Sequence, residues 1–184
     1  KKHYAEKVAI VGAGPTGLSA AYYLARRGYG VTIFDAMPVA GGMMAIGIPD
    51  YRLPRTELQR DITAITELGV ELRLNTAIGR DISLDELQAE YASVVLAVGA
   101  QRSQQMGIPG EASFLEVIPA TTFLKDFNLD ATTKLTGTVA VVGGGSTAMD
   151  AARSALRAGA ESVHILYRRS RAEMPAQQEE IRAA

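Results

Sequence analysis

Short β-branched apolar runs that stop at a glycine occur twice in the chain, at residues 8–11 and at residues 139–142. After each run, apolar positions recur every three or four residues until another glycine, Gly28 in the first copy and Gly159 in the second. A β-branched run indicates a strand, and a period of three to four residues indicates a helix. Both copies therefore predict a strand, a tight turn and a helix.

A further β-branched run begins soon after each of these glycines, at residues 31–34 and at residues 163–166. Strand, helix and strand in this order form a βαβ unit, and its two strands are parallel. The predicted fold class is therefore α/β. We expect a Rossmann-like domain, with a parallel sheet flanked by helices, followed by the start of a second Rossmann-like domain.

The segment between the two copies contains four further predicted elements. Residues 54–69 have the apolar spacing of a helix, and residues 70–74 alternate like a strand. Ser83 with Glu86 matches the capping box that begins a helix. The apolar run at residues 94–98 predicts a buried strand.

The next segment is less regular and contains the predicted domain boundary. Residues 101–110 read as a loop, a short helix is expected around residues 121–127, and residues 128–136 have the composition of a linker. We therefore expect a first domain at residues 1–136 and a second domain that begins at residue 137 and runs to residue 184.

The first glycine turn has the spacing of a dinucleotide-binding loop. Gly12 permits a tight turn, Gly14 lets the backbone approach a pyrophosphate, and Gly17 lets helix and strand pack closely. Pro15 suits a first helical turn, and Asp35 ends the second strand, where a carboxylate accepts hydrogen bonds from a ribose. The alternative is a turn whose glycines serve sterics alone, but the strand, helix and acid together favour nucleotide binding.

A second glycine pair, Gly41 and Gly42, follows this unit. It allows another close backbone approach, and Met43, Ile46 and Ile48 offer an apolar wall for a ring. The alternative interpretation is a surface loop with a hydrophobic anchor.

The second glycine turn repeats the first with one change. Gly143 and Gly145 keep the spacing, but Ala148 replaces the third glycine and adds a methyl group where helix meets strand. This change predicts a slightly wider loop.

The end of the second strand also differs between the copies. Where the first copy has Asp35, the second has Tyr167 followed by Arg168 and Arg169. A carboxylate repels a 2′-phosphate, whereas a guanidinium binds it through charge-assisted hydrogen bonds. The pattern favours NADPH over NADH, and the alternative is a solvated arginine cluster.

Composition excludes several classes of function. The formal net charge is −1, which argues against nucleic acid as the partner. The chain contains no cysteine, so disulfides, Cys-ligated zinc and iron–sulfur clusters cannot be built from it. The two histidines, His3 and His164, are far apart in sequence and are expected to be structural, so no metal site is predicted.

No apolar run approaches the length of a membrane span, and the first seven residues are polar rather than signal-like. These observations predict a cytoplasmic protein that does not bind membranes.

Five stretches give the chain a resemblance to a known family, the flavin-dependent NADPH oxidoreductases typified by the small (beta) subunit of glutamate synthase. Dihydropyrimidine dehydrogenase and ferredoxin:NADP transhydrogenase contain similar parts. The matching stretches are residues 11–17, 41–54, 96–100, 143–153 and 167–175. The resemblance covers nearly the whole chain.

The resemblance implies two cofactors. FAD would be bound by Gly12, Gly14, Pro15, Thr16, Gly17, Asp35, Ala36, Gly41, Gly42, Met43, Ile78, Gly99 and Ala100. NADPH would be bound by Gly143, Gly144, Gly145, Ser146, Thr147, Ala148, Arg168, Arg169 and Glu180. Within these sets, the backbone of Ile78 would read the adenine of FAD, and Glu180 would contact a ribose of NADPH.

The chain departs from the family in two respects. Ser146 stands where relatives often have Asn, and the chain stops at Ala184, whereas relatives continue through the second domain and then return to the first. We therefore expect an N-terminal fragment in which both cofactor sites are partial.

The reaction implied by the resemblance is hydride transfer from NADPH to FAD, after which electrons pass to iron–sulfur centres in a partner domain or subunit. No catalytic side chain is expected, and Asp50, Asp81 and Asp85 are interpreted as structural. Two alternatives remain. One is a free-standing NAD(P)H-dependent flavin reductase or dehydrogenase, and the other is a nucleotide-binding fragment without turnover.

Overall fold

The computed structural model describes residues 3–130 and 132–184. The three other positions belong to the polar N-terminus and the linker of the sequence prediction, and they lie outside the described residues. The chain divides into two compact units. The first comprises Lys1–Ala45 and Asp50–Ala100, and the second comprises Ile46–Pro49 and Gln101–Ala184.

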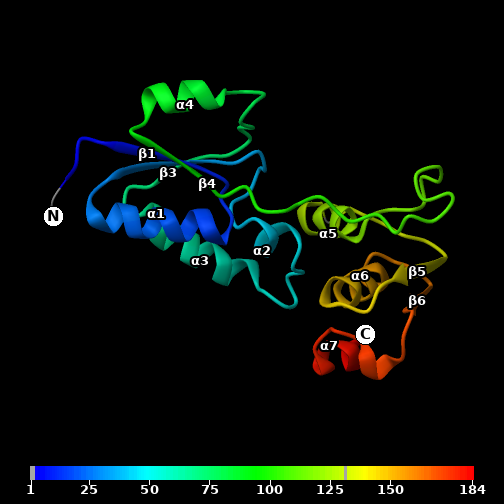
Figure 1. Cartoon of the computed structure of the whole chain (residues 1–184). Helices are drawn as coiled ribbons and strands as arrows, with labels where there is room; N and C mark the ends of the chain where they lie inside the picture. Colours follow the sequence, from blue (N-terminus) through cyan, green and yellow to red (C-terminus); the bar gives the residue numbers. More distant parts are fainter. Residues whose placement is uncertain (1–2, 131) are drawn as a thin grey trace. The chain divides into compact units, whose positions relative to one another are not determined.

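The first unit is built on a four-stranded parallel sheet (Figure 1). Its strands are β1 (Lys7–Val11), β2 (Gly30–Phe34), β3 (Glu71–Arg73) and β4 (Ser93–Leu96), and their spatial order is β3-β2-β1-β4. In the register, Val11 lies beside both Phe34 and Leu96. The carboxyl ends of three strands therefore meet at one edge of the sheet, which is where ligands bind in open α/β folds.

Helices cover both faces of this sheet. The helices between its strands are α1 (Pro15–Arg27), α2 (Met43–Ile46), α3 (Arg55–Thr66) and α4 (Leu84–Glu90). Figure 1 shows α4 on one face and α1 with α3 on the other. On the α4 face, Phe34, Leu87 and Tyr91 form a buried cluster with residues of β1. Alternation along β1 and β2 sends their other side chains to the opposite face, so both sides of the sheet are packed.

The capping box predicted at the start of α4 is confirmed. The Glu86 N–H donates to the Ser83 hydroxyl oxygen over 3.1 Å, and the Ser83 N–H donates to the Glu86 carboxylate over 2.7 Å. These two bonds pair backbone donors that a helix start otherwise leaves unsatisfied. The short helix α2 was not predicted.

The prediction of a buried strand at residues 94–98 is confirmed for the strand and wrong for its burial and its end. The strand β4 ends at Leu96, and the side chains of Leu96 and Val98 are 64% and 58% exposed. The reason is that β4 pairs with β1 alone among the described strands and lies at the edge of the sheet.

The second unit contains the second βαβ arrangement. Its elements are α5 (Ala120–Leu129), β5 (Thr138–Val142), α6 (Ser146–Arg157), β6 (Ser162–Leu166), the 3-10 helix η1 (Arg171–Glu173) and α7 (Gln178–Ala183). Strands β5 and β6 are parallel. Val141, Met149 and Ile181 belong to one buried cluster, against which Phe123 of α5 packs.

The packing of α5 bears on the domain boundary. The sequence places the boundary at residue 136, whereas the compact units divide after Ala100. The physical reason for this difference is that α5 packs on the core of the second unit. In addition, α5 runs to Leu129, so helix replaces the first residues of the predicted linker.

Candidate nucleotide-binding sites

The first glycine turn connects β1 to α1 and leaves no room for side chains. Gly12 has a φ of +110°, and a Cβ built on it would lie 2.2 Å from the Ala97 carbonyl oxygen. A Cβ on Gly17 would lie 1.9 Å from the Gly12 carbonyl oxygen. Both distances are far below van der Waals contact, so this turn requires glycine at both positions.

The start of α1 is open to an anion. Gly14 is the N-cap and contributes no side-chain hydrogen bond, and Pro15 occupies the first helical turn. The first N–H groups of a helix have no partners within it, and the helix dipole makes this end positive. The sequence therefore leaves the first-turn N–H groups, among them that of Thr16, to a ligand such as a pyrophosphate.

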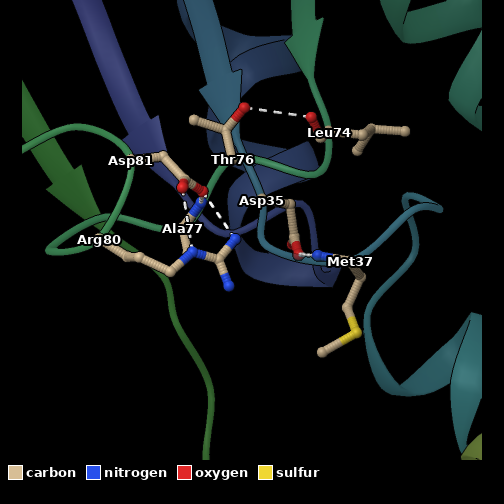
Figure 2. A network of polar contacts seen from close by, with 7 residues as sticks. All are labelled: Asp35, Met37, Leu74, Thr76, Ala77, Arg80 and Asp81. Carbon is tan, nitrogen blue, oxygen red and sulfur yellow. Dashed lines mark hydrogen bonds and ion pairs between the residues drawn. The ribbon is translucent and has the colours of Figure 1, made fainter.

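Asp35 joins this turn to the end of β2. Its Oδ2 accepts the Ala13 N–H over 2.6 Å, and its Oδ1 accepts the Met37 N–H over 2.8 Å, the second of which Figure 2 shows. Each carboxylate oxygen has two lone pairs, so both oxygens keep acceptor capacity for a ribose hydroxyl. Ala36, which lies between Asp35 and Met37 in the sequence, is exposed.

The chain after β3 pairs with this same segment. The Asp35 carbonyl accepts the Thr76 N–H over 2.8 Å, and the Met37 carbonyl accepts the Asn75 N–H over 3.1 Å. Asn75 has a φ of 54°, in the left-handed region that asparagine tolerates. These bonds bring residues far apart in sequence, Asp35 and the predicted adenine residue Ile78, into one corner of the unit.

Asp81 closes the turn that contains Ile78, and Figure 2 shows its bonds to Ala77 and Arg80. The Asp81 Oδ2 accepts the Ala77 N–H over 2.8 Å and pairs with the Arg80 guanidinium over 2.8 Å. The Arg80 hydrogen bond, and then the Ala77 N–H, lower the pKa of Asp81 to about 2. A parallel bridge between Ile78 and Ile82 completes the turn.

The second glycine pair lies against the first glycine turn. The Gly41 N–H donates to the Ala13 carbonyl over 2.8 Å, and a Cβ on Gly42 would lie 2.8 Å from the Gly14 Cα. Met43 follows directly as the first residue of α2, with its side chain partly exposed. The structure thus brings together two motifs that the sequence analysis found separately.

Gly99 and Ala100 follow β4 and are exposed. The strand before them is fixed to the same turn, because the Ala97 N–H donates to the Val11 carbonyl over 2.8 Å. Gly99 has a φ of +69°, and nothing lies within 4 Å of a Cβ built on it. The backbone at this point is therefore open to a neighbouring molecule.

The second glycine turn connects β5 to α6 and is less tight than the first. Gly143 has a φ of +147°, and its N–H donates to the Leu166 carbonyl over 2.9 Å. A Cβ on Gly143 would lie 3.1 Å from the Ala148 Cβ, so the turn holds the alanine methyl that Gly17 excludes in the first copy. Gly145 is the N-cap of α6 and again contributes no side-chain hydrogen bond.

The first turn of α6 contains Ser146 and Thr147, of which Thr147 is exposed. Arg168 and Arg169 follow β6 after Tyr167, and both are exposed. Glu180 is buried in α7, where its carboxylate accepts the Gln177 N–H over 3.3 Å. The predicted contact of Glu180 with a ribose stays a prediction.

Sequence reasoning missed the groups that hold these loops from a distance. They are the backbone of Ala13, Met37 and Ala97 and the ring of Tyr167, which packs on Gly144. A backbone donor or acceptor has no signature in the sequence. The sequence at Tyr167 indicates only an uncharged residue and not that its ring packs on Gly144.

Two of the three acidic residues interpreted as structural, Asp50 and Asp81, hold backbone N–H groups. The Asp50 carboxylate accepts the Arg55 N–H over 2.8 Å at the start of α3, and Asp81 closes the turn described above. Asp85 lies in the first turn of α4. Over residues 3–130 and 132–184, no cluster of three or more His, Cys, Asp or Glu side chains is arranged to hold a metal ion.

Two parallel sheets, each with a glycine turn that leads into an open helix N-terminus, define a protein of the dinucleotide-binding class. Residues 6–184 match the model of the family described as pyridine nucleotide-disulphide oxidoreductase. The chain therefore belongs to this family.

Several relatives are named as a subunit or a small chain. The chain is 59% identical over 181 residues to NADP(+)-dependent formate dehydrogenase subunit beta of Moorella thermoacetica, covering 97% of this chain and 26% of the relative. It is 51% identical to NADPH-Fe(3+) oxidoreductase subunit beta of Geobacter sulfurreducens, with 97% and 27% covered. It is 37% identical to the glutamate synthase [NADPH] small chain of Escherichia coli, with 100% and 41% covered. The chain thus spans about a quarter of the length of the first two relatives.

A solved structure has the same fold. FprA of Mycobacterium tuberculosis in complex with NADPH superposes with a TM-score of 0.80 at 23% identity, covering 97% of this chain and 47% of FprA. Together with the family and the relatives, this likeness confirms the expected fold class. The resemblance to the glutamate synthase small subunit and the expected pair of cofactors, FAD and NADPH, are confirmed by the family and the relatives. In the part of the chain that the structure describes, no helix combines the length and apolarity needed to cross a bilayer.

Proposed function

We propose that this chain is the nucleotide-binding part of an NADPH-dependent FAD oxidoreductase, in which the first glycine turn binds FAD and the second binds NADPH. One observation carries the proposal: both βαβ arrangements have a glycine turn that leads into a helix, but the charges that follow their second strands differ. The first ends at Asp35, whose carboxylate lies at the glycine turn, and the second leads into Arg168 and Arg169.

Domain assignment is part of the same proposal. Residues 1–136 contain the FAD domain, and residues 137–184 contain the first part of the NADPH domain. The chain covers 26% and 41% of the length of two of its relatives, so the proposed NADPH domain would continue beyond residue 184.

The residues of the first unit fit FAD. Its pyrophosphate would lie at Gly14 and Thr16, beside the open start of α1. The ribose would meet Asp35, and the adenine would meet the backbone of Ile78. Gly42 packs on Gly14 and extends the side-chain-free surface toward α2, which suits the passage of a long cofactor.

In the second unit, Gly143, Gly145 and Ala148 would bind the pyrophosphate of NADPH at the start of α6. Arg168 and Arg169 would bind its 2′-phosphate, because guanidinium groups form paired charge-assisted hydrogen bonds with phosphate oxygens. Both side chains are exposed and therefore accessible to a ligand.

When bound, the two cofactors supply hydride transfer from the nicotinamide to the flavin. The chain's own residues bind and orient the two nucleotides. No side chain of this chain is proposed to donate or accept a proton in that step, so no catalytic residue is assigned.

Electrons would leave the flavin for a partner. Relatives named beta subunits and small chains support a partner domain or subunit. The chain has no cysteine, so iron–sulfur centres that receive electrons must be bound by residues outside it. The relatives include subunits of a formate dehydrogenase and of an Fe(3+) oxidoreductase. Because these names indicate different reactions, they support a shared role in passing electrons from NADPH to different acceptors. We propose a cytoplasmic location, where NADPH is available.

The experiment is a visible absorption spectrum of the purified chain after incubation with FAD and removal of free cofactor, followed by anaerobic addition of NADPH. We expect retained flavin bands that bleach on NADPH addition. Retained bands without bleaching would favour a nucleotide-binding fragment without turnover. A chain that retains no flavin would contradict the proposed FAD site. Equal bleaching by NADH would favour a flavin reductase without phosphate selectivity.

A further inference from the structure

The corner between the end of β2 and the turn at Ile78 contains an exposed cation, Arg80. Arg80 lies two residues after Ile78 in the sequence, and its side chain is 72% exposed. Figure 2 shows this side chain running from its own backbone toward Asp35 and ending in a guanidinium that contacts Asp81. The guanidinium therefore lies in the corner where Asp35 is proposed to bind the ribose of FAD.

Two hydrogen bonds hold the Arg80 guanidinium in one orientation. Its Nε donates to the Asp81 Oδ1 over 3.0 Å, and its Nη2 donates to the Asp81 Oδ2 over 2.8 Å. A pair of bonds to one carboxylate fixes the plane of a guanidinium as well as its position. Asp81 is held in turn, because the same Oδ2 accepts the Ala77 N–H over 2.8 Å. A flat cation is thus fixed beside the backbone that leads into Ile78, and most of its surface stays exposed.

The backbone of Ile78 offers the groups that an adenine edge requires. The Ile78 side chain packs on the buried cluster of the first unit, which fixes this backbone. In the bridge to Ile82, the bond is formed by the Gly79 N–H, which donates to the Ile82 carbonyl over 2.7 Å. Among the described residues, no backbone group bonds to the N–H or the carbonyl of Ile78 itself. This donor and this acceptor can pair with N1 and the 6-amino group of an adenine.

We propose that the Arg80 guanidinium stacks on the adenine ring of FAD and contributes to the selectivity of the first unit for an adenine dinucleotide. This inference rests on the proposed function, because it requires FAD at the first glycine turn. A guanidinium is flat, cationic and weakly hydrated, and it stacks on the faces of aromatic rings. An adenine that is bound through its edge by Ile78 keeps its faces available for such a partner.

The same geometry allows two simpler roles for Arg80, and each predicts a different result. As a clamp, Arg80 would act only through its ion pair with Asp81, and any cation at this position would serve. As a charge, it would attract the diphosphate of FAD and would not distinguish one base from another. Stacking differs from both, because it needs a flat group on the protein and a large ring on the ligand.

The test compares FAD with flavin uracil dinucleotide, which has the same flavin and diphosphate but a smaller base. Dissociation constants for the whole chain are measured by titration of flavin fluorescence. For Arg80→Ala we expect FAD binding to weaken at least about 10-fold and binding of the uracil analogue to weaken less than about 3-fold. The ratio of the two affinities reports on the base, because the ligands are otherwise alike.

Two further variants separate the flat group from the ion pair. Arg80→Lys keeps a positive charge beside Asp81 but lacks a flat group, so its ratio should fall toward that of Arg80→Ala. Arg80→Phe has a flat ring that cannot pair with Asp81, and its ratio should stay within about 3-fold of wild type. Arg60→Ala is the matched control, because Arg60 is 70% exposed on α3 and forms a 2.6 Å ion pair with Glu57. Its ratio should equal that of wild type.

The outcomes separate this inference from the proposed function. A wild-type chain that binds neither dinucleotide contradicts the proposed FAD site itself. A wild-type chain that binds both equally, or an unchanged ratio in Arg80→Ala, overturns only the inference on Arg80. A ratio that Arg80→Lys keeps and Arg80→Phe loses assigns the effect to the ion pair and overturns the inference as well. Circular dichroism verifies the folding of each variant, and if Arg80→Ala does not fold, the comparison of Arg80→Lys with wild type decides.

Discussion

The Ala13 N–H donates to the Asp35 carboxylate over 2.6 Å and thereby ties the first glycine turn to the end of β2. The second carboxylate oxygen accepts the Met37 N–H, so one side chain fixes the backbone on both sides of the proposed ribose position. Asp35 therefore has a structural duty that is present before any nucleotide arrives. A substitution at this position should change both stability and binding.

Asp35→Ala should destabilise the first unit by about 2 kcal/mol, because two backbone N–H groups lose their acceptor. FAD retention should fall at least about 10-fold. Asp61→Ala is the matched control, since that carboxylate is 76% exposed on α3. Thermal unfolding and flavin retention of the two variants decide the matter, and equal behaviour of both would refute the role of Asp35.

Gly17→Ala should destabilise the chain by about 3 kcal/mol, since its Cβ would lie 1.9 Å from the Gly12 carbonyl oxygen. The reciprocal change in the second turn, Ala148→Gly, should cost only about 1 kcal/mol, from the higher flexibility of glycine in a helix. Urea unfolding of both variants measures this asymmetry. Similar losses would mean that the two turns are equally tight, contrary to the structure.

Arg168→Ala and Arg169→Ala should each weaken NADPH binding about 10-fold or more and change NADH binding by less than about 2-fold. The physical reason is the loss of charge-assisted hydrogen bonds to the 2′-phosphate, and the difference should shrink as salt is added. Arg182→Ala, at an exposed arginine of α7, is the control. Parallel losses for NADPH and NADH would rule out the 2′-phosphate assignment.

Asp81 should stabilise the chain in a pH-dependent manner. The pKa of its carboxyl is lowered in the folded state from 3.8 to about 2, mainly by Arg80 and then by the Ala77 N–H. A lowered pKa means that the stabilisation is fully present above the unfolded pKa and is lost as the pH falls through about 2. The difference in urea midpoint between wild type and Asp81→Asn should therefore be constant from pH 7 to about pH 4 and should vanish near pH 2.

Arg80→Ala provides the matched test of the same pair, because it removes the main cause of the shift. It should reproduce most of the effect of Asp81→Asn, and the double variant should add little to either. A difference that stays constant down to pH 2 would contradict the proposed pairing.

The repeated βαβ arrangement could be predicted from the sequence, because the features that indicate it are local. A β-branched run, a glycine turn and a helical period lie next to one another, and each acts within a few residues. The capping box of Ser83 and Glu86 was predictable for the same reason. The spacing of Gly12 and Gly17 also indicated the tight turn, although not that the Ala97 carbonyl is what excludes a side chain at Gly12.

Other features depend on segments distant in sequence and could not be predicted from a pattern. The contact of Gly42 with Gly14 requires knowing how the chain returns after β2. The packing of α5 on the second unit depends on tertiary contacts. Because of these contacts, the compact units divide after Ala100 and not at the linker-like residues 128–136. The apolar run before Gly99 has the pattern of a buried strand. Its sequence does not indicate whether other strands pair with it on one side or on both.

The edge position of β4 has a practical consequence for handling the isolated chain. A strand that pairs on one side only presents its outer row of N–H and C=O groups to other molecules, and Leu96 adds apolar surface to that row. At high concentration, two such edges would join copies of the chain into aggregates. The yield of soluble chain from an expression host should therefore improve for Leu96→Lys. Natural proteins place lysine on edge strands because its charge prevents two edges from pairing.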